Sequence, residues 1–173
     1  MSQKRIGIGF VGGGFITRFH IQSMIGVRNC DVLGVMSRTR SSAEESASLA
    51  RTIGVGDAKV YNTVTEMVEE PSIDALWICA PNFTRLEIME EIYNAIDSGK
   101  GELIGVTCEK PLGRNVKEAK KVLELTQKAG LLDGYLENQV FAPSVTRGKE
   151  IIWSRGAKTT GRPYLARAAE EHS

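Results

Sequence analysis

The sequence lacks a long apolar run, a cluster of cysteines and an excess of charge of either sign, and each absence excludes a class of protein. No apolar segment is long enough to span a bilayer. Three cysteines, Cys30, Cys79 and Cys108, are far apart and odd in number, so they predict neither a disulfide framework nor a metal site. The formal net charge is +1, with basic and acidic residues interspersed, which excludes a nucleic-acid footprint or a polybasic membrane anchor.

The composition is that of an ordinary globular protein. Of the 173 residues, 42% are hydrophobic and 25% are charged, enough apolar material for one domain and part of another. Met1 to Arg5 lead directly into an apolar segment, without the hydrophobic region of a signal peptide. We therefore expect a cytoplasmic protein without a metal ion, a nucleic-acid partner or a membrane partner.

The first functional signal is the segment Ile6–Thr17, with the sequence IGIGFVGGGFIT. It predicts a buried strand, a glycine turn and the start of a helix, an arrangement that seats a dinucleotide pyrophosphate. Gly12 would form the tight turn, and Gly14 would let the backbone approach the phosphates. The helix would direct its free N–H groups and its dipole at the anion. Thr17 is larger than the usual third residue of this fingerprint, so a tight turn without a ligand is the alternative.

Apolar segments and helical patterns alternate along the rest of the chain to about residue 138. Short strands are expected at 32–36, 59–61, 73–80, 103–107 and within 134–138. Capping-box pairs that start helices are expected at Ser41 and Glu44, Thr63 and Glu66, Thr84 and Glu87, and Asn115 and Glu118. This alternation predicts an α/β fold, a Rossmann-type doubly wound parallel sheet with helices on both faces.

In such a sheet the loops that follow the strands meet at one edge, where ligands bind. Four segments are expected at this edge: 12–16, 37–40, 80–82 and 109–111. The second of them carries Ser37 and Arg38 where a preference for NAD usually requires an acidic residue. Because a guanidinium binds a 2′-phosphate that a carboxylate would repel, this position favours NADP over NAD. The alternative is that Arg38 and Arg40 are solvated loop residues.

Lys110 is the candidate for chemistry. It follows an apolar strand and precedes Pro111, which favours an extended backbone at Lys110. An ammonium at this edge can polarise a substrate carbonyl or hydroxyl, or relay its proton. Glu109 would pair with Lys110 or hold the ribose of the cofactor, and a surface turn capped by proline is the alternative. His20, in the first helix, is interpreted as a packed or surface residue rather than a ligand.

These segments together resemble the glucose–fructose oxidoreductase, inositol dehydrogenase and rhizopine-catabolism (Gfo/Idh/MocA) family. The resemblance rests on the order and spacing of the glycine turn, Ala80-Pro81-Asn82, Glu109-Lys110-Pro111-Leu112 and Gly161-Arg162-Pro163. Members are NAD(P)-dependent oxidoreductases that act mainly on sugars, cyclitols and related polyols. The resemblance implies that Lys110 lies at the nicotinamide and assists proton transfer. It further implies cofactor contacts for Gly12, Gly14, Phe15, Ile16, Ser37, Arg38, Pro81, Asn82, Glu109 and Lys110.

The resemblance also predicts the domain organisation. Residues 1–140 would form the dinucleotide-binding domain, and residues 141–173, with a helix at 145–154 and an extended segment at 161–167, would begin an α+β substrate domain whose remainder is absent. A chain cut in this way would bind cofactor without turnover, and the intact protein would be a homo-oligomer. Arg85 stands where the family commonly has His, so no role is assigned to it. The alternative function is a non-catalytic, regulatory dinucleotide-binding module.

Overall fold

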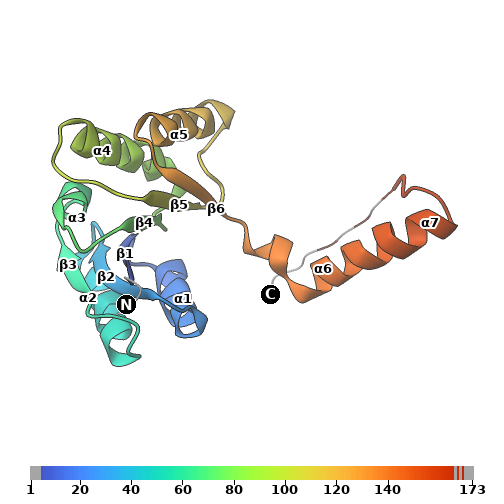
Figure 1. Ribbon diagram of the computed structural model, residues 1–173, viewed down its shortest axis with the longest axis horizontal. Helices are drawn as coiled ribbons and strands as arrows, with labels where there is room; N and C mark the ends of the chain where they lie inside the picture. Colours follow the sequence, from blue (N-terminus) through green and yellow to red (C-terminus); the bar gives the residue numbers. More distant parts are fainter. Residues whose placement is uncertain (1–4, 166, 168, 170–173) are drawn as a thin grey trace. The chain divides into compact units, whose positions relative to one another are not determined.

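The computed structural model describes residues 5–165, 167 and 169, in two compact units, Met1–Leu136 and Glu137–Ser173. The first unit is built on a six-stranded sheet (Figure 1). Its strands are β1 (Ile6–Val11), β2 (Cys30–Met36), β3 (Lys59–Tyr61), β4 (Ala75–Ile78), β5 (Gly105–Glu109) and β6 (Leu132–Leu136). Neighbouring strands all pair in parallel, in the order β3-β2-β1-β4-β5-β6. The predicted Rossmann-type sheet is confirmed.

Helices cover both faces of this sheet (Figure 1). They are α1 (Phe15–Ser23), α2 (Arg40–Thr52), α3 (Val64–Glu69), α4 (Arg85–Asp97) and α5 (Val116–Lys128). Phe10, Ile21 and Ala47 belong to a core between the sheet and α1 and α2. Leu76 and Met89 belong to a second core under α3, α4 and α5. Strand order reverses at β1, so the carboxyl ends of β1 and β4 border a topological switch point.

Two of the four predicted caps are confirmed. The Thr63 hydroxyl accepts a hydrogen bond from the backbone N–H of Glu66 at 3.0 Å, at the start of α3. The Asn115 side chain accepts one from the N–H of Glu118 at 3.0 Å, at the start of α5. In both helices a polar side chain therefore satisfies a donor of the first turn.

The cap predicted at Ser41 is wrong, whereas Thr84 is the N-cap residue of α4 as expected but its side chain makes no capping hydrogen bond. Helix α2 begins at Arg40 with Thr39 as its N-cap, which places Ser41 inside the first turn. A 3₁₀ turn (η2, Asn82–Thr84) directly precedes α4. In this turn the Thr84 hydroxyl donates to the carbonyl of Pro81 at 2.8 Å. Thr84 thus tightens the loop after β4, and its hydroxyl is not the acceptor that a capping box needs.

The last two strands are displaced from the predicted ranges. β5 begins at Gly105 and runs to Glu109, two residues later than expected, and β6 begins at Leu132, two residues earlier than expected. The reason is their mutual register, which pairs Gly105 with Leu132 and Glu109 with Leu136. As a result, Lys110 follows directly on the carboxyl end of a paired strand.

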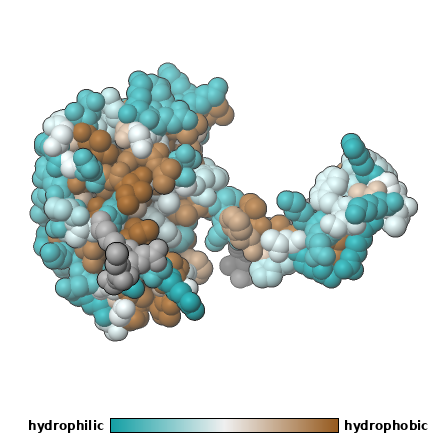
Figure 2. Space-filling model, in the orientation of Figure 1, coloured by the Kyte–Doolittle hydropathy of each residue, from teal (hydrophilic) through white to brown (hydrophobic). Residues whose placement is uncertain are grey.

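The second unit is helical. It contains a 3₁₀ turn (η3, Asn138–Phe141), α6 (Pro143–Glu150), a π-helical turn (η4, Ile151–Gly156) and α7 (Ala157–Thr159). The predicted helix at 145–154 is confirmed and is longer than expected. Residues 161–165 have no regular secondary structure, and part of the predicted extended segment lies outside the described residues. The face of these helices shown in Figure 2 is mainly hydrophilic, although Phe141, Val145, Ile151, Ile152 and Trp153 are exposed on this unit.

No helix in the part of the chain that the structure describes combines the length and hydropathy needed to cross a membrane.

The sequence placed the start of a substrate domain at residue 141, and this stays a prediction.

Candidate functional site

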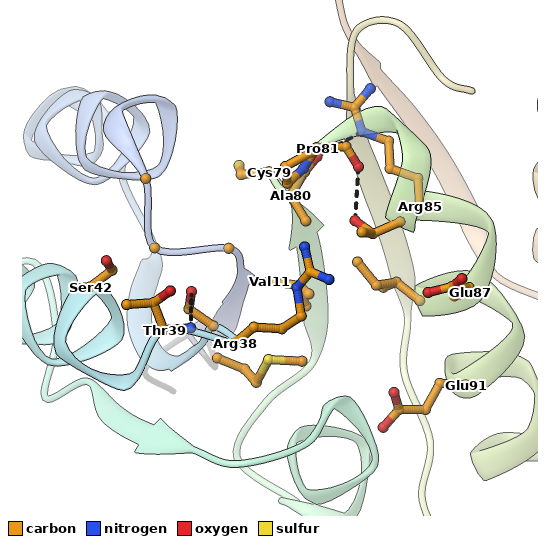
Figure 3. A pocket seen from close by; sticks show the side chains of 17 residues that line it. Val11, Arg38, Thr39, Ser42, Cys79, Ala80, Pro81, Arg85, Glu87 and Glu91 are labelled. Atoms are coloured by element: carbon orange, nitrogen blue, oxygen red, sulfur yellow. Dashed lines mark hydrogen bonds between the residues drawn. The ribbon is translucent and has the colours of Figure 1, made fainter. Parts of the chain in front are cut away.

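A pocket of about 540 Å³ lies at the carboxyl ends of β1, β2 and β4 (Figure 3). Five predicted site residues line it: Gly12, Gly14, Ser37, Arg38 and Pro81. They come from three loops that are far apart in the sequence, and α4 forms the opposite wall. Gly13, Thr39 and Ala80, from the segments expected at this edge, also line it. The lining further contains residues outside those segments: Val11, Met36, Ser42, Cys79, Thr84, Arg85, Glu87, Ile88 and Glu91.

The glycine turn is shaped by three different constraints. Gly12 has φ +120°, and a Cβ there would lie 2.9 Å from the backbone nitrogen of Ala80. A Cβ at Gly13 would lie 2.8 Å from the carbonyl of Ser42, so this glycine lets α2 approach the turn. A Cβ at Gly14 would meet no protein atom within 4 Å. Gly14, which lines the pocket, therefore leaves open a space that the protein does not fill.

The N-terminus of α1 is available to an anion. Gly14 is its N-cap, no side chain caps it, and its first turn contains no acidic residue. The first N–H groups of a helix have no intrahelical partner, and they carry the positive end of the helix dipole. Together with the open space at Gly14, this geometry fits the pyrophosphate of a dinucleotide.

Thr17 fits the fold despite its size. Its side chain is fully buried, and its hydroxyl donates to the carbonyl of Gly12 at 3.0 Å. Close packing of α1 against β1 is therefore kept, and the third position of the fingerprint gains a hydrogen bond that fixes the turn. The incomplete motif had left this point open.

Charged side chains of both signs border the pocket. Figure 3 shows Arg38 extending from the end of β2, with Glu87 and Glu91 on the α4 side. The Arg38 guanidinium lies 5.8 Å from the ring centroid of Phe83, which is a cation–π contact. Glu91 is engaged at the start of α3, where it accepts from the N–H of Thr65 at 2.8 Å.

Arg40, the other arginine of this loop, is committed elsewhere. It lies outside the pocket lining, donates to Glu44 at 3.0 Å and to Asn62 at 2.9 Å, and is largely exposed. Arg40 is therefore solvated, as the alternative expected, but it begins α2 and is not a loop residue, whereas Arg38 faces the pocket.

Cys79 contributes a buried thiol to the pocket wall. Burial, with the nearby Glu109 carboxylate, raises the pKa of the Cys79 thiol to about 12. Burial likewise raises the pKa of Cys108 to about 11. Both side chains therefore stay protonated near neutral pH, and they act as small apolar groups rather than nucleophiles.

Arg85 braces the rim, a role that the sequence did not reveal. The residue is only 5% exposed, and its Nε donates to the carbonyl of Ala80 at 3.0 Å. Its Nη1 donates to the carbonyls of Glu109 and Pro111. One buried guanidinium thus ties the loop after β4 to the loop after β5. Arginine suits this place because its planar fork presents several donors at once.

The remaining predicted site residues lie outside the lining of this pocket, although the structure describes all of them. Phe15 begins α1 and is 76% exposed, and Ile16 packs against the core under α1. Asn82 begins the 3₁₀ turn after β4. Glu109 is buried at the end of β5, and Lys110 is exposed.

The Glu109 carboxylate makes two hydrogen bonds. Its Oε2 accepts from the backbone N–H of Lys110 at 3.0 Å, and its Oε1 lies 2.8 Å from Nε2 of His20. The expected pairing of Glu109 with Lys110 therefore runs through the Lys110 backbone. His20 packs edge-on against Trp77, with ring centroids 5.2 Å apart, so its interpretation as a packed residue holds.

The fold and the pocket define an NAD-binding Rossmann domain. Residues 6–134 match the family described as "Oxidoreductase family, NAD-binding Rossmann fold", the Gfo/Idh/MocA family. Because this match covers most of the chain, the protein belongs to the Gfo/Idh/MocA oxidoreductase family, as the sequence predicted.

Relatives agree with this assignment. The 1,5-anhydro-D-fructose reductase of Ensifer adhaerens is 30% identical over 126 residues, 73% of this chain and 34% of that protein. The myo-inositol 2-dehydrogenase of Thermotoga maritima is 26% identical over 160 residues, 92% of this chain and 43% of that protein. The crystal structure of GenD2 from gentamicin A biosynthesis, in complex with NAD, shares the fold, with a TM-score of 0.73 and 24% identity over 91% of this chain and 41% of that one. The chain thus spans less than half the length of these relatives.

Proposed function

We propose that this chain is the cofactor-binding part of an oxidoreductase that transfers a hydride between a nicotinamide and a CH–OH carbon of a sugar, cyclitol or related polyol. The observation that carries the proposal is the meeting of the three strand-end loops around one pocket beside an uncapped helix N-terminus. Sugar- and inositol-related activities in the names of relatives support the substrate class.

The residues divide the work of binding. Gly12 and Gly14, with the start of α1, would hold the pyrophosphate, while Ser37 and Arg38 would contact the adenosine ribose. Phe15, Ile16, Pro81 and Asn82 would border the cofactor on either side, and Glu109 would contact it at the end of β5. When bound, the dinucleotide supplies the hydride acceptor or donor. Lys110 would supply or take up the proton of the substrate oxygen.

The substrate-binding part is expected beyond the matched region, because relatives are more than twice as long as this chain. We therefore propose that the 173 residues alone bind cofactor without turnover, and that the intact protein is a cytoplasmic homo-oligomer. Three free, buried cysteines support a reducing compartment.

A regulatory dinucleotide-binding module is the second candidate. The exposed position of Lys110, outside the pocket lining, favours it. In that case the dinucleotide would act as a signal, and Lys110 would carry no chemistry.

Replacing Arg38 by Asp tests the preference for NADP. We expect calorimetry to show tighter binding of NADPH than of NADH to the wild-type chain, and Arg38→Asp to weaken NADPH binding roughly 10- to 100-fold, the equivalent of one lost charge-assisted hydrogen bond. NADH affinity should change less than about threefold, because NADH lacks the 2′-phosphate that the guanidinium would bind. Arg40→Asp, the same charge change outside the pocket, is the control and should leave the preference intact. Equal wild-type affinities for the two cofactors would reject the assignment.

Replacing Lys110 by Met tests the chemistry and separates the two candidate functions. In a protein completed by fusing the C-terminal part of a longer relative to this chain, polyols are screened by the absorbance change of the nicotinamide. Lys110→Met should lower kcat by roughly 100-fold or more, the range of general acid–base catalysis, with little change in cofactor affinity. A variant as active as the wild type would remove Lys110 from the mechanism. A completed protein that binds cofactor and oxidises no polyol would favour the regulatory module.

A further inference from the structure

The backbone of the Glu109–Pro111 segment is held from both faces of the sheet. From one face, His20 on α1 contacts the Glu109 carboxylate, whose second oxygen accepts the Lys110 N–H. From the other face, Arg85 on α4 donates to the carbonyls of Glu109 and Pro111. The two helices belong to different hydrophobic cores, so neither contact follows from the other.

The contact between His20 and Glu109 is shielded and directional. The side chains are only 12% and 7% exposed, and the distance between Nε2 and Oε1 is 2.8 Å. A hydrogen bond to an ionised carboxylate, which only accepts, requires that Nε2 of His20 carries the proton. Trp77 packs edge-on against the imidazole, with centroids 5.2 Å apart, and Phe19 borders it at 6.2 Å. These rings fix the imidazole plane and thereby aim the donor at Glu109.

The buried Glu109 carboxylate contacts both His20 and the Lys110 N–H, so the position of His20 affects the position of the Lys110 backbone. If His20 holds Oε1, the carboxylate cannot rotate, and Oε2 stays in place for the Lys110 N–H. The Lys110 side chain then leaves the strand end in one direction. Hydrogen bonds to a charged group inside a shielded site are stronger than neutral ones, which suits a residue whose ammonium must meet a reacting atom.

We propose that His20 is a positioning residue that acts through Glu109 to fix the backbone of Lys110 at the cofactor site. We call the contacts of His20 with Glu109 and of Glu109 with the Lys110 N–H the clamp. That the clamp serves catalysis rests on the proposed function. That the clamp exists can be tested without cofactor. A residue that only fills space beside Trp77 would tolerate any ring at position 20, whereas a positioning residue requires the N–H donor.

The test compares His20→Phe, which keeps a ring and removes the donor, with His20→Gln, which keeps a donor and removes the ring. Amide hydrogen exchange of the ¹⁵N-labelled chain is followed by NMR. We expect Lys110 exchange to rise about tenfold in His20→Phe and less than threefold in His20→Gln, since the Phe variant leaves the carboxylate free to turn. The amide of Val106, inside β5, should keep its wild-type rate in both variants. Glu109→Gln, which replaces one accepting oxygen by a donor, should behave like His20→Phe and serves as the test if the latter fails to fold.

Titration with NADPH then links the clamp to the cofactor. The Lys110 resonance should shift on titration in the wild type and in His20→Gln, and by less than half as much in His20→Phe. Unchanged Lys110 exchange in both His20→Phe and Glu109→Gln would overturn the positioning role. Equal exchange in the two His20 variants would overturn it as well. A wild-type chain whose resonances ignore NADPH and NADH would instead contradict the proposed function.

Discussion

Gly14→Ala is expected to weaken dinucleotide binding by about 30-fold or more, the equivalent of roughly 2 kcal/mol, without unfolding the protein. The reason is that a Cβ at Gly14 would meet no protein atom within 4 Å and would occupy the space that we propose for the pyrophosphate. The backbone at Gly14, with φ −82° and ψ −168°, is open to any residue. Isothermal calorimetry gives the affinity, and urea denaturation gives the free energy of unfolding, which should change by less than about 1 kcal/mol.

Two other glycines supply the controls. Gly26→Ala also adds a Cβ that meets nothing within 4 Å, but at the end of the 3₁₀ turn Met24–Gly26 that follows α1, and it should change neither affinity nor stability appreciably. Gly13→Ala would bring its Cβ to 2.8 Å from the carbonyl of Ser42, so it should destabilise the fold itself. Wild-type affinity in Gly14→Ala would place the dinucleotide elsewhere.

Arg85→Met is expected to lower the free energy of unfolding by about 3 kcal/mol, or roughly 6–12 °C in Tm for a chain of this size. Methionine keeps an unbranched apolar stem like that of arginine but has no hydrogen-bond donor. The carbonyls of Ala80, Glu109 and Pro111 would lose their guanidinium partner at a site where Arg85 is only 5% exposed. Binding of dinucleotide should weaken in parallel, because Ala80 and Pro81 line the pocket.

Arg40→Met is the matched control for Arg85→Met. Arg40 is largely exposed and pairs with Glu44 on the surface of α2, so its loss should cost less than about 1 kcal/mol. Arg85→Lys should fall close to Arg85→Met, because a single ammonium lacks the planar fork that serves several carbonyls. Thermal and urea denaturation measure all three. A stability of Arg85→Met within 1 kcal/mol of the wild type would show that the brace is dispensable.

The fold and much of the pocket followed from the sequence because both depend on local patterns. The spacing of apolar residues and the capping residues at helix starts predicted the alternation of strands and helices. A parallel sheet then requires the loops after β1, β2 and β4 to meet at one edge. Gly12, Arg38 and Pro81 line one pocket for this reason. The cap misplaced at Ser41 and the hydroxyl of Thr84, which bonds the carbonyl of Pro81 instead of the helix, show the limit of such patterns.

The contacts that hold the segment Glu109-Lys110-Pro111 could not be predicted from the sequence. Arg85 meets partners 24 and 26 positions away, and His20 meets Glu109 across 89 positions. Neither contact has a spacing rule, because each depends on how a helix crosses the sheet. One signal of the Arg85 contacts was available. Arg85 lies beside the apolar face of the helix predicted after Asn82, and a buried charge needs partners.

The central claim is that the edge of the sheet beside α1 holds a nicotinamide dinucleotide. Its most direct test is calorimetric titration of the 173-residue chain with NADPH and NADH. The account predicts saturable binding at one site per chain, tighter for NADPH and weakened by Gly14→Ala. The absence of binding heat with either coenzyme, from a chain whose circular dichroism shows the α/β fold, would contradict it.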